Sequence, residues 1–181
     1  MRPEILTPAD FMALALFIAA TCVVGGVLMY RRRNMCQRSA QTAVALLGED
    51  FRVTRTHVWP GGFRVVGELR GRSTMLVLEA FQGCRQLSLD MTCSGAGLFD
   101  IGPRDGSKSS AAQIADDATR NMTNRVVQQF CARVMLDVRS GLESDKHLTV
   151  TLPELPRDLT PPSNLRTIAH NALDLCALLE R

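Results

Sequence analysis

The sequence predicts an α+β fold in which a single N-terminal transmembrane helix precedes an antiparallel sheet of about five strands, packed against two or three helices. Three patterns predict this fold. An uncharged apolar run comes first, strand-like segments joined by tight turns follow, and amphipathic helical patterns fill most of the C-terminal half. Because strands joined by short turns pair with their neighbours, the middle of the chain is expected to form an antiparallel meander.

The apolar run extends from Phe11 to Tyr30 and contains no charged side chain. A helix of this length measures about 30 Å, which is the hydrocarbon thickness of a bilayer. The run is therefore interpreted as a transmembrane helix in the lipid bilayer, after a short extracytoplasmic tail at residues 1–10. A cleaved signal peptide is the alternative, but it would have a basic tail and a shorter apolar core.

Arginines mark one end of this run. Arg31, Arg32 and Arg33 follow it directly, whereas the ten residues before it carry one arginine and two acidic residues. Basic residues stay preferentially on the cytoplasmic side of a membrane. The expected location is the cell (inner) membrane of a bacterium, with a single pass, the N-terminus outside and the C-terminal domain in the cytoplasm.

Small residues recur within the apolar run at a spacing of four, which places them on shared helix faces. Such faces let a second transmembrane helix approach closely. The candidate helix–helix contact residues are Ala15, Ala19, Thr21, Cys22, Gly25 and Gly26. Other membrane-protein subunits are accordingly expected as partners.

Residues 31–48 are expected to form a basic, helical juxtamembrane segment. Asn34–Leu47 contains neither proline nor glycine, and its apolar side must pack on another element. Gly48 then suits a left-handed helix cap. The remaining residues, 49–181, are assigned to one cytoplasmic α+β domain.

Four strands are predicted next, over residues 51–58, 63–69, 74–81 and 85–93. The first two are joined by Trp59-Pro60-Gly61-Gly62, in which proline followed by glycine is typical of a turn. The only tryptophan, Trp59, is interpreted in two ways: as a core residue of the meander, which is favoured, or as an exposed anchor for a partner. An exposed tip near the membrane would also touch lipid headgroups.

The segment from Ser94 to Ser109 is rich in glycine and is predicted to be a long loop. Gly95-Ala96-Gly97 lacks the further glycine and the lysine of a phosphate-binding loop, so a hinge is the favoured interpretation. If the protein is a membrane-tethered sensor or ligand-binding module, this loop is expected to form the mouth of its site.

The C-terminal part is expected to contain helix, strand and helix. Apolar residues at four-residue spacing predict a helix from Ser110 to Val138, either continuous or divided in two near Asn121. Alternation over residues 147–152 predicts a fifth strand. A proline-rich connector follows, and a last amphipathic helix is predicted to begin near Thr160.

Charge and cysteine content limit the classes of function. The net charge of +3 comes largely from the arginines beside the apolar run, so the domain is nearly neutral and no nucleic-acid partner is expected. The chain has six cysteines, which a cytoplasmic domain would keep as thiols. Cys84 and Cys93 are the first pair expected to form a disulfide if the topology is reversed.

No motif for catalysis, a metal or a cofactor is found in the sequence. The histidines are isolated, and a surface contact between His170 and Asp174 is favoured over a metal site or a proton shuttle. An enzyme would need titratable residues that converge only in space. The candidates for such convergence are Asp90, Asp100, Asp105, His57, His147 and Cys93.

The predicted function is that of a non-catalytic, single-pass accessory or scaffolding subunit that docks onto a larger membrane protein complex. A membrane-tethered sensor or ligand-binding module is the first alternative. A membrane-bound enzyme with a site invisible in the sequence is the second. The prediction depends on the absence of catalytic motifs, the neutral domain and the small residues in the span.

Overall fold

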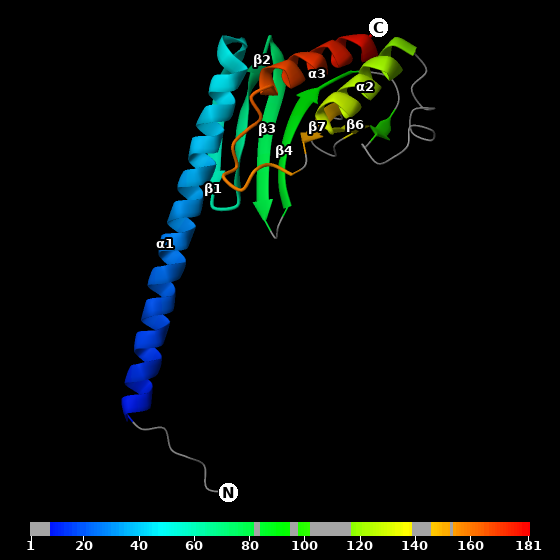
Figure 1. Cartoon of the computed structure of the whole chain (residues 1–181). Coiled ribbons are helices and arrows are strands. Elements are labelled where there is room, and N and C mark those ends of the chain that lie inside the picture. Colours follow the sequence, from blue (N-terminus) through cyan, green and yellow to red (C-terminus); the bar gives the residue numbers. More distant parts are fainter. Residues whose placement is uncertain (1–7, 82–83, 95–97, 102–116, 139–145, 153) are drawn as a thin grey trace, which may run out of the picture.

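The computed structural model of the chain describes residues 8–81, 84–94, 98–101, 117–138, 146–152 and 154–181. In chain order the elements are α1 (Pro8–Leu47), the 3₁₀ helix η1 (Gly48–Asp50), β1 (Phe51–Trp59), β2 (Gly62–Leu69), β3 (Arg72–Phe81), β4 (Cys84–Thr92), β5 (Phe99–Ile101), α2 (Asp117–Phe130), β6 (Arg133–Val138), β7 (Lys146–Leu152) and α3 (Leu165–Leu179) (Figure 1). The predicted α+β fold, with a long apolar N-terminal helix, is confirmed.

All strands in the described part of the chain belong to one antiparallel sheet with the order β1-β2-β3-β4-β7-β6-β5. The four predicted meander strands form one half of it, and β7 joins β4 to β6. Alternate side chains of the strands, such as Leu76 and Leu78, are fully buried under the helices. The helices therefore cover one face of the sheet, and β1 and β5 form its two edges (Figure 1).

The helix α1 is continuous and has two different halves (Figure 1). Its N-terminal half is apolar and exposed, and it is long and apolar enough to cross a membrane. Its C-terminal half packs on the domain through buried residues one turn apart, including Cys36, Ala40, Ala43 and Leu47. The helix ends at Leu47, directly before Gly48, whose φ of 71° is the left-handed value predicted for a cap.

The helix predicted over residues 110–138 is wrong in its C-terminal part. It ends at Phe130, and Arg133–Val138 forms β6. Cys131 has a φ of 49°, which is incompatible with a continuing helix. Val134 and Leu136 are two residues apart and both are buried, which is the pattern of a strand. The apolar residues four apart that predicted a helix are also compatible with this pattern. Residues 110–116 lie outside the described residues.

Within the described residues the sheet has seven strands rather than about five, because β5 and β6 extend it beyond β7. β5 lies within the segment predicted to be a loop, and its three residues are too few to show an alternating pattern. The last helix also begins later than predicted. α3 starts at Leu165, whose N–H donates a hydrogen bond to the carbonyl oxygen of Pro162.

Candidate partner-binding groove

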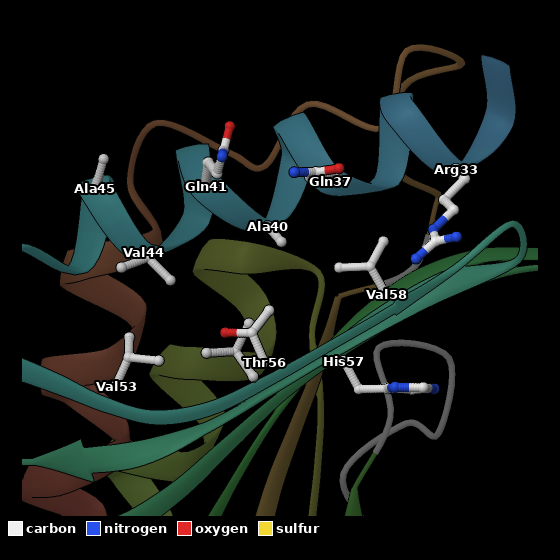
Figure 2. Close-up of a pocket in the computed structure, with 11 residues that line it drawn as sticks. Arg33, Gln37, Ala40, Gln41, Val44, Ala45, Val53, Thr56, His57 and Val58 are labelled. Atoms are coloured by element: carbon white, nitrogen blue, oxygen red, sulfur yellow. The ribbon is translucent and has the colours of Figure 1, made fainter. Parts of the chain in front are cut away.

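An open groove of about 690 Å³ lies between the C-terminal half of α1 and the edge strand β1 (Figure 2). The residues that line it come from α1, β1 and the neighbouring strand β2. They are Arg33, Gln37, Ala40, Gln41, Val44, Ala45, Val53, Thr56, His57, Val58 and Val65. We call this feature the α1–β1 groove.

One face of α1 forms the wall of the groove. Arg33, Gln37, Ala40 and Val44 follow one another at intervals of three and four residues, which places them on one side of a helix. This side lies next to the buried side of α1. Figure 2 shows Ala40 and Val44 directed toward the strand and Arg33 reaching toward Val58. The wall is therefore apolar in its middle and basic at the end nearest the apolar span.

The floor of the groove is β1, and an irregularity in this strand shapes it. The pairing register with β2 shifts between Val53 and Arg55. Such a bulge changes which side chains share a face. Val53, Thr56 and Val58 accordingly point toward α1, whereas His57 points away from it (Figure 2). Val53 remains 39 % exposed, which is unusual for an apolar side chain at a helix–strand interface.

The outer edge of the groove is an open sheet edge. β1 pairs only with β2 in the described part of the chain, so the backbone groups on its other side have no strand partner. The strand is nine residues long, and residues 52–57 are exposed. A long exposed edge strand is a template for pairing with another chain.

The strand edge beside the groove is basic, although its two arginines do not line the groove itself. Arg52 and Arg55 lie on β1, which has no acidic residue, and Arg33 lies at the end of the groove nearest the apolar half of α1. Within the described residues, none of these three arginines forms an ion pair. An extended segment with carboxylates therefore matches both the backbone and the charge of this strand edge.

The structure brings two of the six candidate catalytic residues together. Asp90 on β4 and His147 on β7 lie with Oδ1 and Nδ1 3.0 Å apart. The Asp90 side chain is only 3 % exposed. The pair lies on the side of the sheet opposite the buried Leu89 and Leu148, and it lines none of the described cavities. It is a cross-strand contact between neighbouring strands.

The other candidate catalytic residues are placed elsewhere. Cys93 is buried under the helices, and Asp100 on β5 forms a bidentate ion pair with Arg133. His57 lies on the edge strand β1, three strands away from β4. Asp105 lies outside the described residues. The five of these residues that the structure describes therefore do not form one cleft.

His170 contacts Asp50 rather than Asp174. Its Nε2 lies 3.3 Å from Oδ2 of Asp50, and Arg166 donates a hydrogen bond of 2.8 Å to the same oxygen. This hydrogen bond from Arg166 is the main cause that lowers the pKa of Asp50. The cluster joins η1 to α3. In the described residues no group of three side chains is arranged to hold a metal ion.

The disulfide considered for a reversed topology is excluded by the fold. Cys84 begins β4 and Cys93 follows its end, so the strand separates them by about 30 Å. Their Cα atoms would have to lie within about 7 Å for a disulfide. Cys93 instead interacts with Cys176 on α3.

The remaining predicted contact residues are accessible. Ala15, Ala19, Thr21, Cys22, Gly25 and Gly26 are all exposed on the apolar half of α1. Thr21 donates its hydroxyl hydrogen to the carbonyl oxygen of Phe17. Trp59 is half-buried and lies outside the core, with its indole ring 5.5 Å from the ring of His57.

The segment considered as the mouth of a ligand site is only partly described. Ser94 donates its N–H to Glu180, and Phe99–Ile101 is the edge strand β5. Residues 95–97, including Gly95-Ala96-Gly97, and residues 102–109 lie outside the described part. The described cavities are lined by other residues.

Comparison with known proteins gives no relative from which a function can be transferred. No protein-family model matches the chain, and no curated protein or solved structure matches it either. The groove is therefore interpreted from its own geometry and charge. Sequence reasoning did not find it, although the run of arginine and threonine in Phe51–Trp59 was a sign of an exposed strand.

Proposed function

We propose that this protein is a non-catalytic, single-pass membrane protein that serves as an accessory or scaffolding subunit of a larger membrane protein complex. Its N-terminus lies outside the cell membrane and its domain lies in the cytoplasm. The α1–β1 groove binds an extended, acidic segment of a partner subunit. The single observation that carries this proposal is the edge of β1, which lies beside an apolar helix wall. Among the described residues this edge has no strand partner and its arginines form no ion pair.

The length of the groove fits a short strand. From Arg33 to Ala45 the wall extends over about 18 Å of helix. A strand of five or six residues has about the same length. Such a strand would hydrogen-bond to the free edge of β1 and place its apolar side chains against Ala40 and Val44. Carboxylates on its other side chains would meet the arginines of β1.

A second copy of this chain fits the groove less well than an acidic partner. Two antiparallel β1 strands would bring Arg52, Arg55 and His57 of both copies together across the new pairing. Like charges directly opposite each other destabilise strand pairs. The partner is therefore a different chain.

The direction of α1 connects the groove with the membrane. Successive residues of a helix are rotated by 100°, so positions along a continuous helix can be assigned to a common side. Four small residues of the span fall in the same sector of about 60° as Arg33, Gln37, Ala40 and Val44. They are Ala15, Ala19, Cys22 and Gly26. A partner helix on this side of the span would continue directly into the groove.

A small apolar ligand is the second candidate occupant, as expected for a membrane-tethered sensor. The volume of about 690 Å³ lies within the range of ligand pockets. The groove is open along the whole strand edge, however, whereas ligand pockets bury most of the ligand surface. This openness favours a polypeptide.

Site-specific photo-crosslinking in native membranes tests the proposal. A photoreactive residue replaces Val53 in the groove, and the same residue replaces the exposed Ser73 as the control. The expected result is an adduct with another integral membrane protein from Val53 only. The crosslinked peptide of the partner is expected to lie beside a transmembrane segment and to contain aspartate or glutamate.

Charge reversal sharpens this test. The double change of Arg52→Glu and Arg55→Glu is expected to reduce the adduct about fivefold or more, because two favourable charge contacts become repulsive. Arg125→Glu, on the exposed side of α2, is the matched control and leaves the adduct unchanged. Adducts only with lipid, only with a second copy of the chain, or equally from Ser73 would contradict the proposal.

A further inference from the structure

The turn between β1 and β2 lies at the end of the sheet that is closest to the exposed half of α1 (Figure 1). The contacts of two residues of α1, Arg32 and Cys36, fix the position of the turn along the helix. Arg32 donates a hydrogen bond to the carbonyl oxygen of Ala80 at the end of β3, and the N–H of Ala80 bonds to the carbonyl oxygen of Gly61 in the turn. The thiol of Cys36 contacts the carbonyl oxygen of Pro60. The turn is therefore level with residues 32–36 of α1.

This height corresponds to the headgroup layer of a membrane. Residues 32 and 36 lie about 3 Å and about 9 Å beyond Tyr30, the last residue of the apolar run. The polar layer on each side of the hydrocarbon core is about 5–8 Å thick. If residues 11–30 span the bilayer, as in the proposed function, the turn lies within this layer.

The side chain at the tip of the turn suits such a position. Trp59 is half-buried, and its indole lies over two glycines of the turn. A Cβ atom at Gly61 would be 3.2 Å from its Nε1, and a Cβ atom at Gly62 would be 3.2 Å from its Cζ2. The glycines and the ring of His57 therefore hold the indole at the surface. Tryptophan is enriched at this depth because it joins an apolar ring to a polar N–H group.

Basic side chains occupy the same level. Arg31 is exposed on α1, and Arg85 pairs in register with Ala80, the residue that Arg32 contacts. Within the described residues neither Arg31 nor Arg85 forms an ion pair. Arginines near a cytoplasmic membrane surface are attracted by anionic lipids. We call Arg31, Trp59, Pro60 and Arg85 the membrane-proximal rim.

We propose that the membrane-proximal rim binds the headgroups of anionic lipids, with Trp59 inserted in the headgroup layer and the arginines against lipid phosphates. This contact would fix the tilt of the domain on the membrane, and it would present the open edge of β1 in a constant direction. The inference depends on the membrane span of the proposed function but not on its partner groove.

The single tryptophan makes a direct test possible in the full-length protein. The protein is reconstituted in vesicles of phosphatidylcholine, with or without one quarter phosphatidylglycerol, and lipids brominated near the headgroup serve as quenchers. We expect these lipids to quench Trp59 and to do so at least twice as strongly in the anionic vesicles. Absence of quenching, or equal quenching in both vesicles, would overturn the proposal.

Tryptophans placed at two other positions show whether absence of quenching at Trp59 means that the rim does not contact lipid or that residues 11–30 do not span the membrane. In a Trp59→Phe background, Phe17→Trp is expected to be quenched by lipids brominated deep in the chain, because Phe17 lies within the apolar run and is 70 % exposed. Ser73→Trp, at the other end of the sheet, is expected to be quenched by aqueous iodide only. If Phe17→Trp resists the deep quencher, the span itself is wrong.

A charge variant tests the role of the arginines. Arg85→Gln is expected to remove at least half of the extra quenching that anionic lipid causes. Arg125→Gln, on an exposed site of α2, is expected to leave it unchanged. Equal behaviour of the two variants would contradict the assignment of Arg85 to lipid binding.

Discussion

The thiols of Cys93 and Cys176 interact in the core, where the end of β4 meets α3. The contact with Cys93 and burial both raise the pKa of the Cys176 thiol. A protonated, buried thiol is a poor nucleophile. These two cysteines are therefore expected to be unreactive in the folded protein. Whether they are thiols or a disulfide is expected to show whether the domain lies in a reducing or an oxidising compartment.

The first prediction concerns alkylation by a maleimide. In the native protein the exposed Cys84 and Cys131 are expected to react, whereas Cys93 and Cys176 react only after denaturation. If the domain is cytoplasmic, Cys93 and Cys176 are thiols in the cell, so after denaturation they react with the maleimide without prior reduction. Mass spectrometry of the labelled peptides measures it. A Cys93–Cys176 disulfide in freshly isolated membranes would show that the domain lies in an oxidising compartment.

The second prediction concerns acid stability. Arg72 binds both carboxylate oxygens of Glu180, at 2.6 Å and 2.7 Å, and it also donates to the carbonyl oxygen of Thr92. The hydrogen bonds from Arg72, followed by the N–H of Ser94, lower the pKa of Glu180 to about 2. The contact between Arg72 and Glu180 thus joins the end of α3 to the turn between β2 and β3.

The pKa of Glu180 is lower in the folded state than in the unfolded state. The ionised side chain therefore stabilises the fold fully above its unfolded pKa of about 4.3, and this stabilisation is lost as the pH falls toward 2. Glu180→Gln is expected to lower the free energy of unfolding by about 1–2 kcal/mol at pH 7, and by much less at pH 3. Urea unfolding at both pH values, followed by Trp59 fluorescence, measures this difference. Glu79→Gln, on an exposed glutamate, is the control. An equal loss at both pH values would contradict the prediction.

The sequence predicted the elements whose pattern is local. The end of α1 at Gly48 and the turn at Trp59–Gly62 follow from glycine and proline chemistry, and the alternation after Cys84 identified β4. β6 was missed because the spacing from Val126 to Val138 fits a helix as well as a strand. Only Cys131, with its positive φ, and Ala132 separate the two elements.

The candidate site was less predictable because it depends on strand order. Residues 51–58 are predicted to form a strand, and their arginines and threonines indicate exposure, but nothing local indicates that this strand forms the edge of the sheet. The pairing of Cys93 with Cys176 likewise joins residues far apart in the sequence. Such contacts depend on the whole topology and leave no periodic pattern.

The third prediction concerns the close approach of β1 and β2. A Cβ atom at Gly67 would lie 2.4 Å from the carbonyl oxygen of Arg52 and 2.9 Å from the ring of Phe51. Gly67→Ala is therefore expected to push β1 outward and to destabilise the domain by about 1–3 kcal/mol. Urea unfolding measures the loss, and crosslinking from Val53 is expected to weaken with it.

Gly71→Ala is the comparison for this variant. Gly71 has a φ of 80°, but a Cβ atom there would meet no atom within 4 Å. Only backbone strain of about 1–2 kcal/mol is then expected, without an effect on the groove. If Gly71→Ala weakened crosslinking from Val53 as strongly as Gly67→Ala, loss of overall stability rather than displacement of β1 would be the cause.

The fourth prediction uses two neighbouring glycines of the span. A Cβ atom at Gly25 or Gly26 would meet no atom of this chain within 4 Å, so leucine at either position is expected to leave the fold and membrane insertion intact. The two positions differ in direction by 100°. Gly26 lies on the side of α1 that leads into the groove, whereas Gly25 does not.

A partner helix that packs on the groove side of the span would be displaced by Gly26→Leu but not by Gly25→Leu, because close helix approach requires small residues at the contact. We expect Gly26→Leu to reduce the partner adduct from Val53 about tenfold and Gly25→Leu to leave it unchanged. A loss of the adduct with Gly25→Leu but not with Gly26→Leu would place the partner on another face of the span. Indifference to both changes would mean that the groove binds its partner without the help of the membrane helix, and that α1 contributes only an anchor below Arg31.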